Sequence, residues 1–307
     1  MSLIALFKAK GKNGFGYDTT AEEVTKNISL SGKTILVTGC NSGLGNETIR
    51  VLALRGAKII GTARTKEKAI EALKEISGNS HIGLECELSN PTSVRNCISE
   101  IKKQKLKLDV IICNAGIMAL PSLEKAYGYE LQFFTNHIGH FLLVTGLVGE
   151  LTDEGRVVML SSEAHRNAPK EGVDFENLAG EKYYSAWTFY GQSKFANLLF
   201  AKELAKRFVG TKKTAYAVHP GVIKTNLARN MNPVLQAIFS LGEHLFLKSI
   251  PEGAATQCYA ATNPNVISES GNYFADCNIA TPRKDANNED LAKKLWDVSE
   301  KIVAGLT

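Results

Sequence analysis

Two side chains in the second half of the chain could together move a proton. Tyr190 and Lys194 lie four residues apart in a helical pattern over residues 187–208, so their side chains share one face of the expected helix. An ammonium group beside a phenol favours the phenolate, which would lower the pKa of Tyr190 from its usual value of about 10 toward neutral pH. We therefore expect Tyr190 to act as a general acid or base. Because a Tyr-x-x-x-Lys pair is also common on solvated helix faces, other residues must point to the same site.

A glycine-rich turn near residue 40 has the spacing of a phosphate-binding loop. The apolar run 35–38 stops at Gly39, and Gly43 and Gly45 follow in a G-x-x-x-G-x-G pattern before a helical pattern begins. A strand, turn and helix in this order present backbone N–H groups to a phosphate. Gly39 suits the tight turn, Gly43 lets the main chain approach a pyrophosphate, and Gly45 lets the helix pack on the sheet. We expect the pyrophosphate of a nucleotide cofactor to bind here.

Strand and helix patterns alternate along the chain. Short apolar runs predict strands over residues 35–38, 58–62, 81–87, 108–113, 155–160, 214–218 and 271–274. The helical patterns include one long helix over 124–151 and others over 187–208, 252–262 and 289–303. This alternation predicts an α/β fold, a Rossmann-type doubly wound parallel sheet of about seven strands with helices on both faces. Such sheets bind ligands beyond the carboxyl ends of their strands.

The residue that follows the second strand bears on the choice of cofactor. An acid at this position would bind both hydroxyls of the adenosine ribose and repel a 2′-phosphate, whereas a basic residue would pair with that phosphate. Here the sequence reads Ala63-Arg64-Thr65-Lys66, and no acid occurs before Glu67. We therefore predict NADP(H) in preference to NAD(H), with Arg64 as the main contact. If Arg64 is only a solvated loop residue, the preference stays undecided.

Three further strand ends carry small or polar residues that would face the same crevice. They are Glu87 and Leu88 after the third strand, Asn114, Ala115 and Gly116 after the fourth, and Ser161, Ser162 and Glu163 after the fifth. We expect Glu87 and Leu88 beside an adenine. Small residues over 114–116 let a loop lie along a bound nucleotide, although Asn114 could instead be a turn residue that hydrogen-bonds its own backbone.

The predicted helix over 124–151 carries three polar residues within about one turn. His137 and His140 have the i, i+3 spacing of two metal ligands, but no third ligand has a suitable spacing. We therefore predict no metal site and interpret both histidines as packing or hydrogen-bonding residues. Asn136 is an amide among phenylalanines and must find hydrogen-bond partners if it is buried.

Together these residues resemble the short-chain dehydrogenases/reductases, in their compact branch. The matching segments are Thr38-Gly39-Cys40-Asn41-Ser42-Gly43-Leu44-Gly45, Asn114-Ala115-Gly116, Asn136, Ser162, Tyr190-Gly191-Gln192-Ser193-Lys194 and Pro220-Gly221 with Thr225. The segment between Ser162 and Tyr190, the run 136–141 and the helix start at 251–254 resemble the retinol dehydrogenase and WW-domain-containing oxidoreductase group. Unlike that group, the sequence shows no membrane anchor and no WW domain, and Glu87 stands where Asp is more usual.

The resemblance implies a role for each of four residues. Tyr190 would give a proton to a carbonyl oxygen or take one from an alcohol, while Ser162 hydrogen-bonds the same oxygen and the nicotinamide exchanges a hydride. Ser161 could exchange roles with Ser162. Lys194 would lower the pKa of Tyr190 and bind the nicotinamide ribose, and Asn136 would hold a water that links Lys194 to solvent.

The resemblance also completes the expected set of cofactor contacts. That set comprises Thr38, Gly39, Asn41, Ser42, Gly43, Leu44, Gly45, Arg64, Glu87, Leu88, Asn114, Ala115, Gly116, Tyr190, Lys194, Pro220, Gly221, Val222 and Thr225. Main chain around Val222 and the hydroxyl of Thr225 would hold the nicotinamide carboxamide and a phosphate.

The segment 225–250 is rich in apolar residues and poor in charges. The resemblance implies a lid over the substrate, and the apolar content predicts a hydrophobic carbonyl or alcohol, such as a retinoid, a steroid, a lipid or a general carbonyl compound. An ordinary core segment, a subunit contact, or a peripheral membrane contact flanked by Arg229 and Lys248 are the alternatives.

Composition limits the remaining classes of function. A content of 44% apolar and 22% charged residues is ordinary for a soluble globular protein, and a net charge of +5 without charge blocks argues against nucleic-acid binding. The six cysteines show no metal or redox spacing, which predicts buried free thiols in the cytoplasm or another reducing compartment. No apolar run is long enough to cross a membrane.

We expect an N-terminal arm over 1–29 that packs on a single domain over 30–307, with a long loop over 163–184 of undetermined role. The predicted function is an NADP(H)-dependent oxidoreductase for a hydrophobic carbonyl/alcohol pair. The alternative is a catalytically weak NADP(H)-sensing interaction protein on the same fold. An epimerase or dehydratase is disfavoured by the glycine spacing. The sequence leaves the oligomeric state open, and the resemblance is compatible with a homodimer formed through helices.

Overall fold

The computed structural model describes residues 8–78, 80–223 and 247–306. Its main feature is an eight-stranded sheet with the order β10-β9-β8-β7-β4-β1-β2-β3. The strands are β1 (Thr34–Thr38), β2 (Lys58–Ala63), β3 (Ile82–Glu85), β4 (Leu108–Cys113), β7 (Leu151–Leu160), β8 (Thr214–His219), β9 (Tyr273–Ala275) and β10 (Asn278–Ile279). All neighbours are parallel except β9 and β10. The predicted Rossmann-type parallel sheet is therefore confirmed, with the antiparallel β10 as an additional edge strand.

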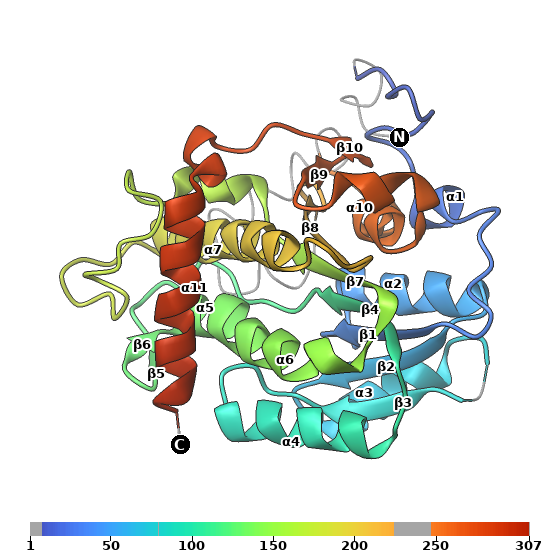
Figure 1. Cartoon of the computed structure of the whole chain (residues 1–307), viewed down its shortest axis with the longest axis horizontal. Helices are drawn as coiled ribbons and strands as arrows, with labels where there is room; N and C mark the ends of the chain where they lie inside the picture. Colours follow the sequence, from blue (N-terminus) through green and yellow to red (C-terminus); the bar gives the residue numbers. More distant parts are fainter. Residues whose placement is uncertain (1–7, 79, 224–246, 307) are drawn as a thin grey trace.

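Helices cover both faces of this sheet (Figure 1). One face carries α1 (Ala21–Val24), α2 (Gly43–Leu54), α3 (Lys66–Lys74) and α10 (Ile250–Thr262), and the other carries α4 (Pro91–Lys103), α6 (Gly139–Leu147), α7 (Ala186–Arg207) and α11 (Glu289–Ala304). Strand β1 is buried on both sides: Ile35 and Val37 pack in the hydrophobic cluster on the α2 and α10 face, and Leu36 packs in the cluster on the α4 and α7 face. Apolar side chains at every position are typical of a central parallel strand.

The expectation of one long helix over 124–151 is wrong. A hairpin comes first, with β5 (Lys125–Ala126) and β6 (Tyr129–Glu130), and its turn places Tyr127 and Gly128 at φ values of +51° and +86°, which no helix allows. The helix starts only at α5 (Leu131–Phe133), where the Glu130 side chain accepts the Phe133 N–H. A π-helical turn (Phe134–Ile138), α6 and a 3-10 turn (Val148–Glu150) follow, and β7 begins at Leu151. The apolar pattern over 124–151 therefore does not distinguish this hairpin and series of short turns from one continuous helix.

The N-terminal arm packs on the sheet edge and on α10, as predicted (Figure 1). Asn13 donates to the Tyr259 hydroxyl and to the Cys277 carbonyl oxygen, and Asn278 donates to the Phe15 carbonyl oxygen. A capping box formed by Thr20 and Glu23 starts α1. The arm therefore contacts the segment around β10, which is far from it in sequence.

The remaining elements are short. They are 3-10 turns at Glu163–Asn167, Pro264–Glu269 and Lys284–Asn287. The six cysteines are buried and free, as predicted. Within the described ranges, the helices lack either the length or the apolar character that a bilayer-spanning segment requires.

Candidate active site

The carboxyl ends of β1 and β4 form the centre of the site. These strands are neighbours, and the chain winds outward from them through β2 and β3 on one side and through β7, β8 and β9 on the other. Such a reversal of strand order leaves a crevice outside the strand ends, where open α/β sheets bind ligands. The glycine loop follows β1 and residues 114–116 follow β4, so the structure brings both predicted segments to this crevice.

The glycine loop has no room for larger side chains. Gly39 has a φ of +67°, and a Cβ there would come within 3.0 Å of the Ala115 Cβ. A Cβ on Gly45 would lie 2.0 Å from the Gly39 carbonyl oxygen. Helix α2 begins directly behind the loop, and the first N–H groups of a helix have no partner within it. The loop and the helix start together form a cradle that suits a phosphate.

A side-chain network ties the loop after β4 to the end of β1. The Thr38 hydroxyl accepts the backbone N–H groups of Asn114 and Ala115, both at 3.0 Å. The Asn114 amide donates in turn to the Thr38 carbonyl oxygen at 2.8 Å and accepts from Gln257. Asn114 is therefore a cross-strand tie and not a turn residue that bonds its own backbone. Thr38 is only 1% exposed, so its side chain lies beneath the crevice.

The four predicted catalytic residues come together beside this crevice. Tyr190 and Lys194 share one face of α7, with the Lys194 Nζ 5.7 Å from the centre of the Tyr190 ring. That amine donates to the Leu160 carbonyl oxygen at the end of β7, at 3.1 Å. Asn136 donates to the Ser193 hydroxyl at 2.9 Å, and Ser193 donates to the Tyr190 carbonyl oxygen at 2.7 Å. The π-helical turn and α7 are thus joined directly at the site.

The pKa of Tyr190 is shifted in the opposite direction to the prediction. Burial raises the pKa of Tyr190 to about 12, although a hydrogen bond with Ser162 acts to lower it. Burial likewise lowers the pKa of Lys194 to about 8. The expectation that Lys194 brings the Tyr190 pKa toward neutral pH is therefore wrong for this structure. Both side chains are almost fully removed from water, which disfavours the charged form of each.

The two neighbouring serines have different surroundings. Ser161 is 2% exposed, and its hydroxyl donates to the Lys194 carbonyl oxygen at 2.8 Å. Ser162 begins the 3-10 turn, accepts the Ala164 N–H at 3.2 Å, and hydrogen-bonds Tyr190. This geometry favours Ser162 over Ser161 as the partner of Tyr190.

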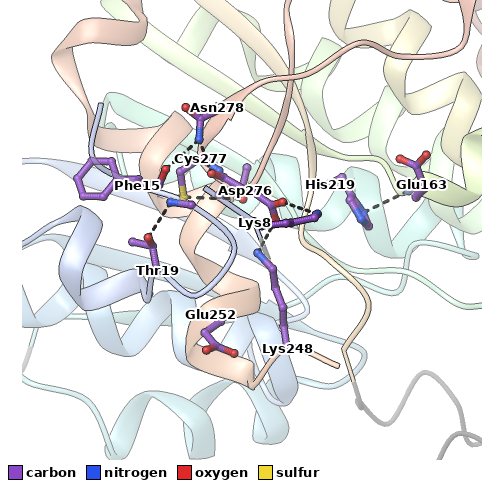
Figure 2. A network of polar contacts seen from close by, with 12 residues as sticks. Lys8, Phe15, Thr19, Glu163, His219, Lys248, Glu252, Asp276, Cys277 and Asn278 are labelled. Carbon is purple, nitrogen blue, oxygen red and sulfur yellow. Dashed lines mark hydrogen bonds and ion pairs between the residues drawn. The ribbon is translucent and has the colours of Figure 1, made fainter. Parts of the chain in front are cut away.

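The loop after β8 is held by a buried lysine that the sequence did not mark for this purpose. Figure 2 shows Lys248 reaching to Asp276, where the amine lies 2.7 Å from the carboxylate and the lysine side chain is 0% exposed. The Lys248 Cδ lies 2.5 Å from the position of a Cβ on Gly221, and the Lys248 N–H donates to the Val222 carbonyl oxygen. The interpretation of Lys248 as the flank of a membrane-facing stripe is wrong, because its charge is buried.

The same loop contacts the segment directly after Ser162 through His219. The His219 Nδ1 accepts the Glu163 N–H at 3.2 Å (Figure 2). Burial lowers the pKa of His219 to about 4. No sequence pattern predicted these contacts of Asp276 and His219. Pro220 and Gly221 are half-buried, and Val222 is 48% exposed.

The other expected cofactor contacts differ in their exposure to solvent. Arg64 is exposed directly after β2, next to the glycine loop, and Asn41 and Ser42 are also exposed. The side chains of Leu44 and Leu88 are buried in the hydrophobic clusters, which leaves only their main chain for a ligand.

Glu87 and Thr225 were also expected to contact the cofactor. The Glu87 carboxylate accepts both the N–H and the hydroxyl of Ser89. Thr225 lies outside the described residues, as does 225–246 of the expected lid.

Within the described part of the chain, no group of three His, Cys, Asp or Glu side chains is arranged for a metal ion.

The sequence is similar to known proteins over most of its length. Residues 33–235 match the short chain dehydrogenase family. The chain is 40% identical over 309 residues to the short-chain dehydrogenase TIC 32 A, chloroplastic, of Brassica napus, covering 96% of each chain. It is 39% identical over 281 residues to retinol dehydrogenase 11 of Mus musculus, covering 90% of this chain and 87% of that one. Retinol dehydrogenase 14 of Homo sapiens is 37% identical over 295 residues, with 89% and 87% covered.

Solved structures share the fold. A crystal structure of an uncharacterized protein from Mycobacterium Paratuberculosis superposes with a TM-score of 0.74 at 32% identity, covering 91% of this chain and 97% of that one. A short chain dehydrogenase from Burkholderia cenocepacia, solved in complex with NADP, has a TM-score of 0.62 at 23% identity, covering 80% and 96%. The chain therefore belongs to the short-chain dehydrogenases, and it is an oxidoreductase that acts on CH–OH groups with a nicotinamide cofactor.

Proposed function

We propose that the chain transfers a hydride between NADP(H) and a hydrophobic carbonyl or alcohol, with Tyr190 as the general acid or base. The observation that carries this proposal is the meeting of Tyr190, Lys194 and Ser162 beside the crevice at the ends of the central strands. The nicotinamide cofactor supplies the hydride, and the chain supplies position and a proton.

The residues around the crevice fit a dinucleotide. The glycine loop and the start of α2 suit the pyrophosphate. At the other end, a Cβ on Gly116 would lie 3.0 Å from the Asn136 Oδ1 and 3.4 Å from the Lys194 Nζ. The absence of a side chain at Gly116 therefore leaves the approach to the Lys194 amine open, which supports a role for Lys194 in binding the nicotinamide ribose.

The protonation states suit carbonyl reduction. Because burial raises the pKa of Tyr190 to about 12, its phenol is neutral at neutral pH and holds a proton to donate. Ser162 hydrogen-bonds Tyr190, which supports a role for Ser162 in hydrogen-bonding the carbonyl oxygen that receives this proton. Loss of the proton creates a phenolate, and the nearby Lys194 ammonium, which persists below pH of about 8, would stabilise it.

Asn136 is suited to connect Lys194 with solvent. Its side-chain oxygen accepts the Ile117 N–H at 2.8 Å, and its amide donates to the Ile117 carbonyl oxygen and to Ser193, both at 2.9 Å. With the side chain committed in this way, the main-chain oxygen of Asn136 is the group that we assign to a water beside Lys194.

Two observations support the finer assignments of cofactor and substrate. Arg64 is exposed beside the glycine loop and can reach a 2′-phosphate without burying its charge. Trp187 packs edge-on against Tyr190, with ring centres 6.2 Å apart, and gives the catalytic residue an apolar neighbour. The names of two relatives, both retinol dehydrogenases, fit a hydrophobic alcohol.

The test is a panel of apolar aldehydes and ketones with NADPH, followed at the absorbance of the reduced cofactor. We expect the wild-type chain to reduce members of the panel and Tyr190→Phe to lose turnover by about a thousandfold, because it removes the proton donor. Cofactor affinity should stay near the wild-type value. Retained turnover in Tyr190→Phe would reject the assignment, and cofactor binding without turnover by the wild type would favour a sensing protein.

A further inference from the structure

Two buried histidines on neighbouring turns face opposite ways. His140 is 0% exposed and lies between the π-helical turn Phe134–Ile138 and strand β1. Its Nδ1 is 2.9 Å from the Asn136 main-chain oxygen, and its Nε2 is 2.9 Å from the Thr38 hydroxyl. His140 thus contacts both the strand that leads into the glycine loop and the turn that carries Asn136.

The neighbours of Thr38 determine which nitrogen of His140 carries the proton. The Thr38 hydroxyl oxygen already accepts the N–H groups of Asn114 and Ala115, both at 3.0 Å. A hydroxyl accepts two hydrogen bonds and donates one, so its hydrogen points to the His140 Nε2. The neutral ring then has its proton on Nδ1 and donates it to the Asn136 oxygen.

The surroundings keep this ring neutral. Burial lowers the pKa of His140 to about 4, and the charge of Lys194 acts in the same direction. His137 also interacts electrostatically with His140, and burial lowers the pKa of His137 itself to about 3. A protonated ring would direct a second N–H at the Thr38 hydroxyl, whose own hydrogen already points there. The arrangement therefore has a single set of donors and acceptors.

We propose that His140 is a positioning residue that couples the loops after β1 and β4 to helix α7, which carries Tyr190. The hydrogen-bond path runs from the 114–115 backbone through Thr38 and His140 to the Asn136 main chain. It continues through the Asn136 side chain and Ser193 to the Tyr190 carbonyl oxygen. The catalytic part of this inference rests on the proposed function.

His137 provides a matched control on the same helix. It is also 0% exposed, but its Nε2 lies 2.8 Å from the Ser299 hydroxyl in α11, and its ring packs against Phe133, Phe141 and Phe200. A substitution at His137 therefore disturbs a comparable volume of core outside the path through Thr38, His140 and Asn136.

Four variants of the full chain separate the two contacts of His140. His140→Phe removes both. His140→Asn places an amide donor near the Nδ1 position and keeps the Asn136 contact, whereas His140→Gln places an oxygen near the Nε2 position and keeps the Thr38 contact. His137→Phe is the control. For each we would measure kcat, the NADPH dissociation constant by fluorescence titration, and thermal unfolding.

The expected results differ between the variants. His140→Phe should lose about tenfold or more in kcat, because small displacements of catalytic groups have large effects, and should bind NADPH several-fold more weakly. His140→Asn should recover most of kcat, and His140→Gln most of the cofactor affinity. His137→Phe should lower the unfolding temperature and leave both functional quantities unchanged. If His140→Phe behaves like His137→Phe, the coupling role is wrong.

A second measurement does not depend on turnover or on tolerance of the substitutions. Nitrogen NMR of labelled histidine side chains in the wild-type chain reports which ring nitrogen is protonated. We expect His140 to carry its proton on Nδ1 at neutral pH, and a proton on Nε2 would overturn the inference. An inactive wild-type protein with the expected His140 tautomer would reject the proposed function and leave the hydrogen-bond tie intact.

Discussion

Two loops flank the candidate cofactor crevice, and they are held in different ways. The loop after β1 rests on neutral hydrogen bonds between Thr38, His140 and the backbone after β4. The loop after β8 rests on a charged pair, in which the Lys248 amine lies 2.7 Å from the Asp276 carboxylate. Burial acts to raise the pKa of Asp276, but the charges and hydrogen bonds of Lys248 and Lys8 together outweigh burial and leave the pKa below its usual value.

Among its described residues, from Lys8 onward, the N-terminal arm contacts the support of the loop after β8. Lys8 lies 3.0 Å from Asp276, and the amines of Lys8 and Lys248 each lie 4.8 Å from the centre of the Tyr17 ring (Figure 2 shows the two lysines at Asp276). Removing one partner of a buried neutral hydrogen bond costs about 1–3 kcal/mol, whereas leaving a buried charge without its partner costs about 3–5 kcal/mol. The comparison therefore predicts that the loop after β8 is the more vulnerable to substitution.

Breaking the ion pair should have the largest effect on stability. Lys248→Met leaves the Asp276 carboxylate without its buried partner, and we expect a loss of about 3 kcal/mol in the free energy of unfolding, measured with urea. The double variant with Asp276→Asn should recover part of this loss, since it removes the stranded charge. A double variant no more stable than Lys248→Met would contradict the charged-pair account.

The neutral support should reveal itself in the dependence of stability on pH. The pKa of His140 is lowered from 6.5 to about 4, so the unfolded chain binds this proton at a higher pH than the folded chain. The contribution of His140 is thus complete above a pH of about 6.5 and is lost as pH falls toward 4. In His140→Asn, we expect the slope of unfolding free energy in this range to fall by about 1.4 kcal/mol per pH unit. An unchanged slope would mean that the ring is not buried as a neutral group.

A change at Arg64 should alter cofactor choice without altering stability. Arg64→Asp replaces a cation at the end of β2 with the acid that favours an unphosphorylated ribose. We expect the ratio of NADPH to NADH affinity to fall by about tenfold or more, since a charge-assisted bond to phosphate is lost. Arg64→Lys is the matched control and should retain most of the preference. Equal discrimination in all three proteins would remove the preference for NADP(H).

The smallest effect is expected where the arm begins its helix. Thr20→Ala removes one half of the capping box with Glu23 and should cost about 1 kcal/mol of unfolding free energy, with turnover unchanged. Thr20→Ser should behave like the wild type. A large loss of turnover in Thr20→Ala would show that the arm supports the site far more strongly than its contacts at Asp276 suggest.

Local patterns in the sequence were sufficient for the central part of the fold and for placing two proposed catalytic residues on one helix face. The strand Leu108–Cys113 has the predicted bounds, because an apolar run that ends in small polar residues is a local signal. Tyr190 and Lys194 share a helix, and their spacing alone places them on one face. The glycine loop was recognisable for the same reason, since its spacing is contained within seven residues.

What the sequence could not predict depends on contacts between distant segments. Lys248 and Asp276 give no pairing signal, and the burial of Lys248 follows only from the tertiary fold. The direction of the Tyr190 pKa shift was missed because desolvation depends on everything packed around α7 and not on the nearby lysine alone. The helix over 124–151 was overextended because Tyr127 and Gly128 mark a hairpin turn that an apolar pattern does not reveal.

The most direct test of the account is a crystal structure of the protein with NADP⁺ bound. We expect the pyrophosphate at the glycine loop and the nicotinamide ring within reach of the Tyr190 hydroxyl, with Lys194 at the adjoining ribose. A nicotinamide ring that lies away from Tyr190, with another part of the chain between them, would contradict the assignment of Tyr190 as the proton donor.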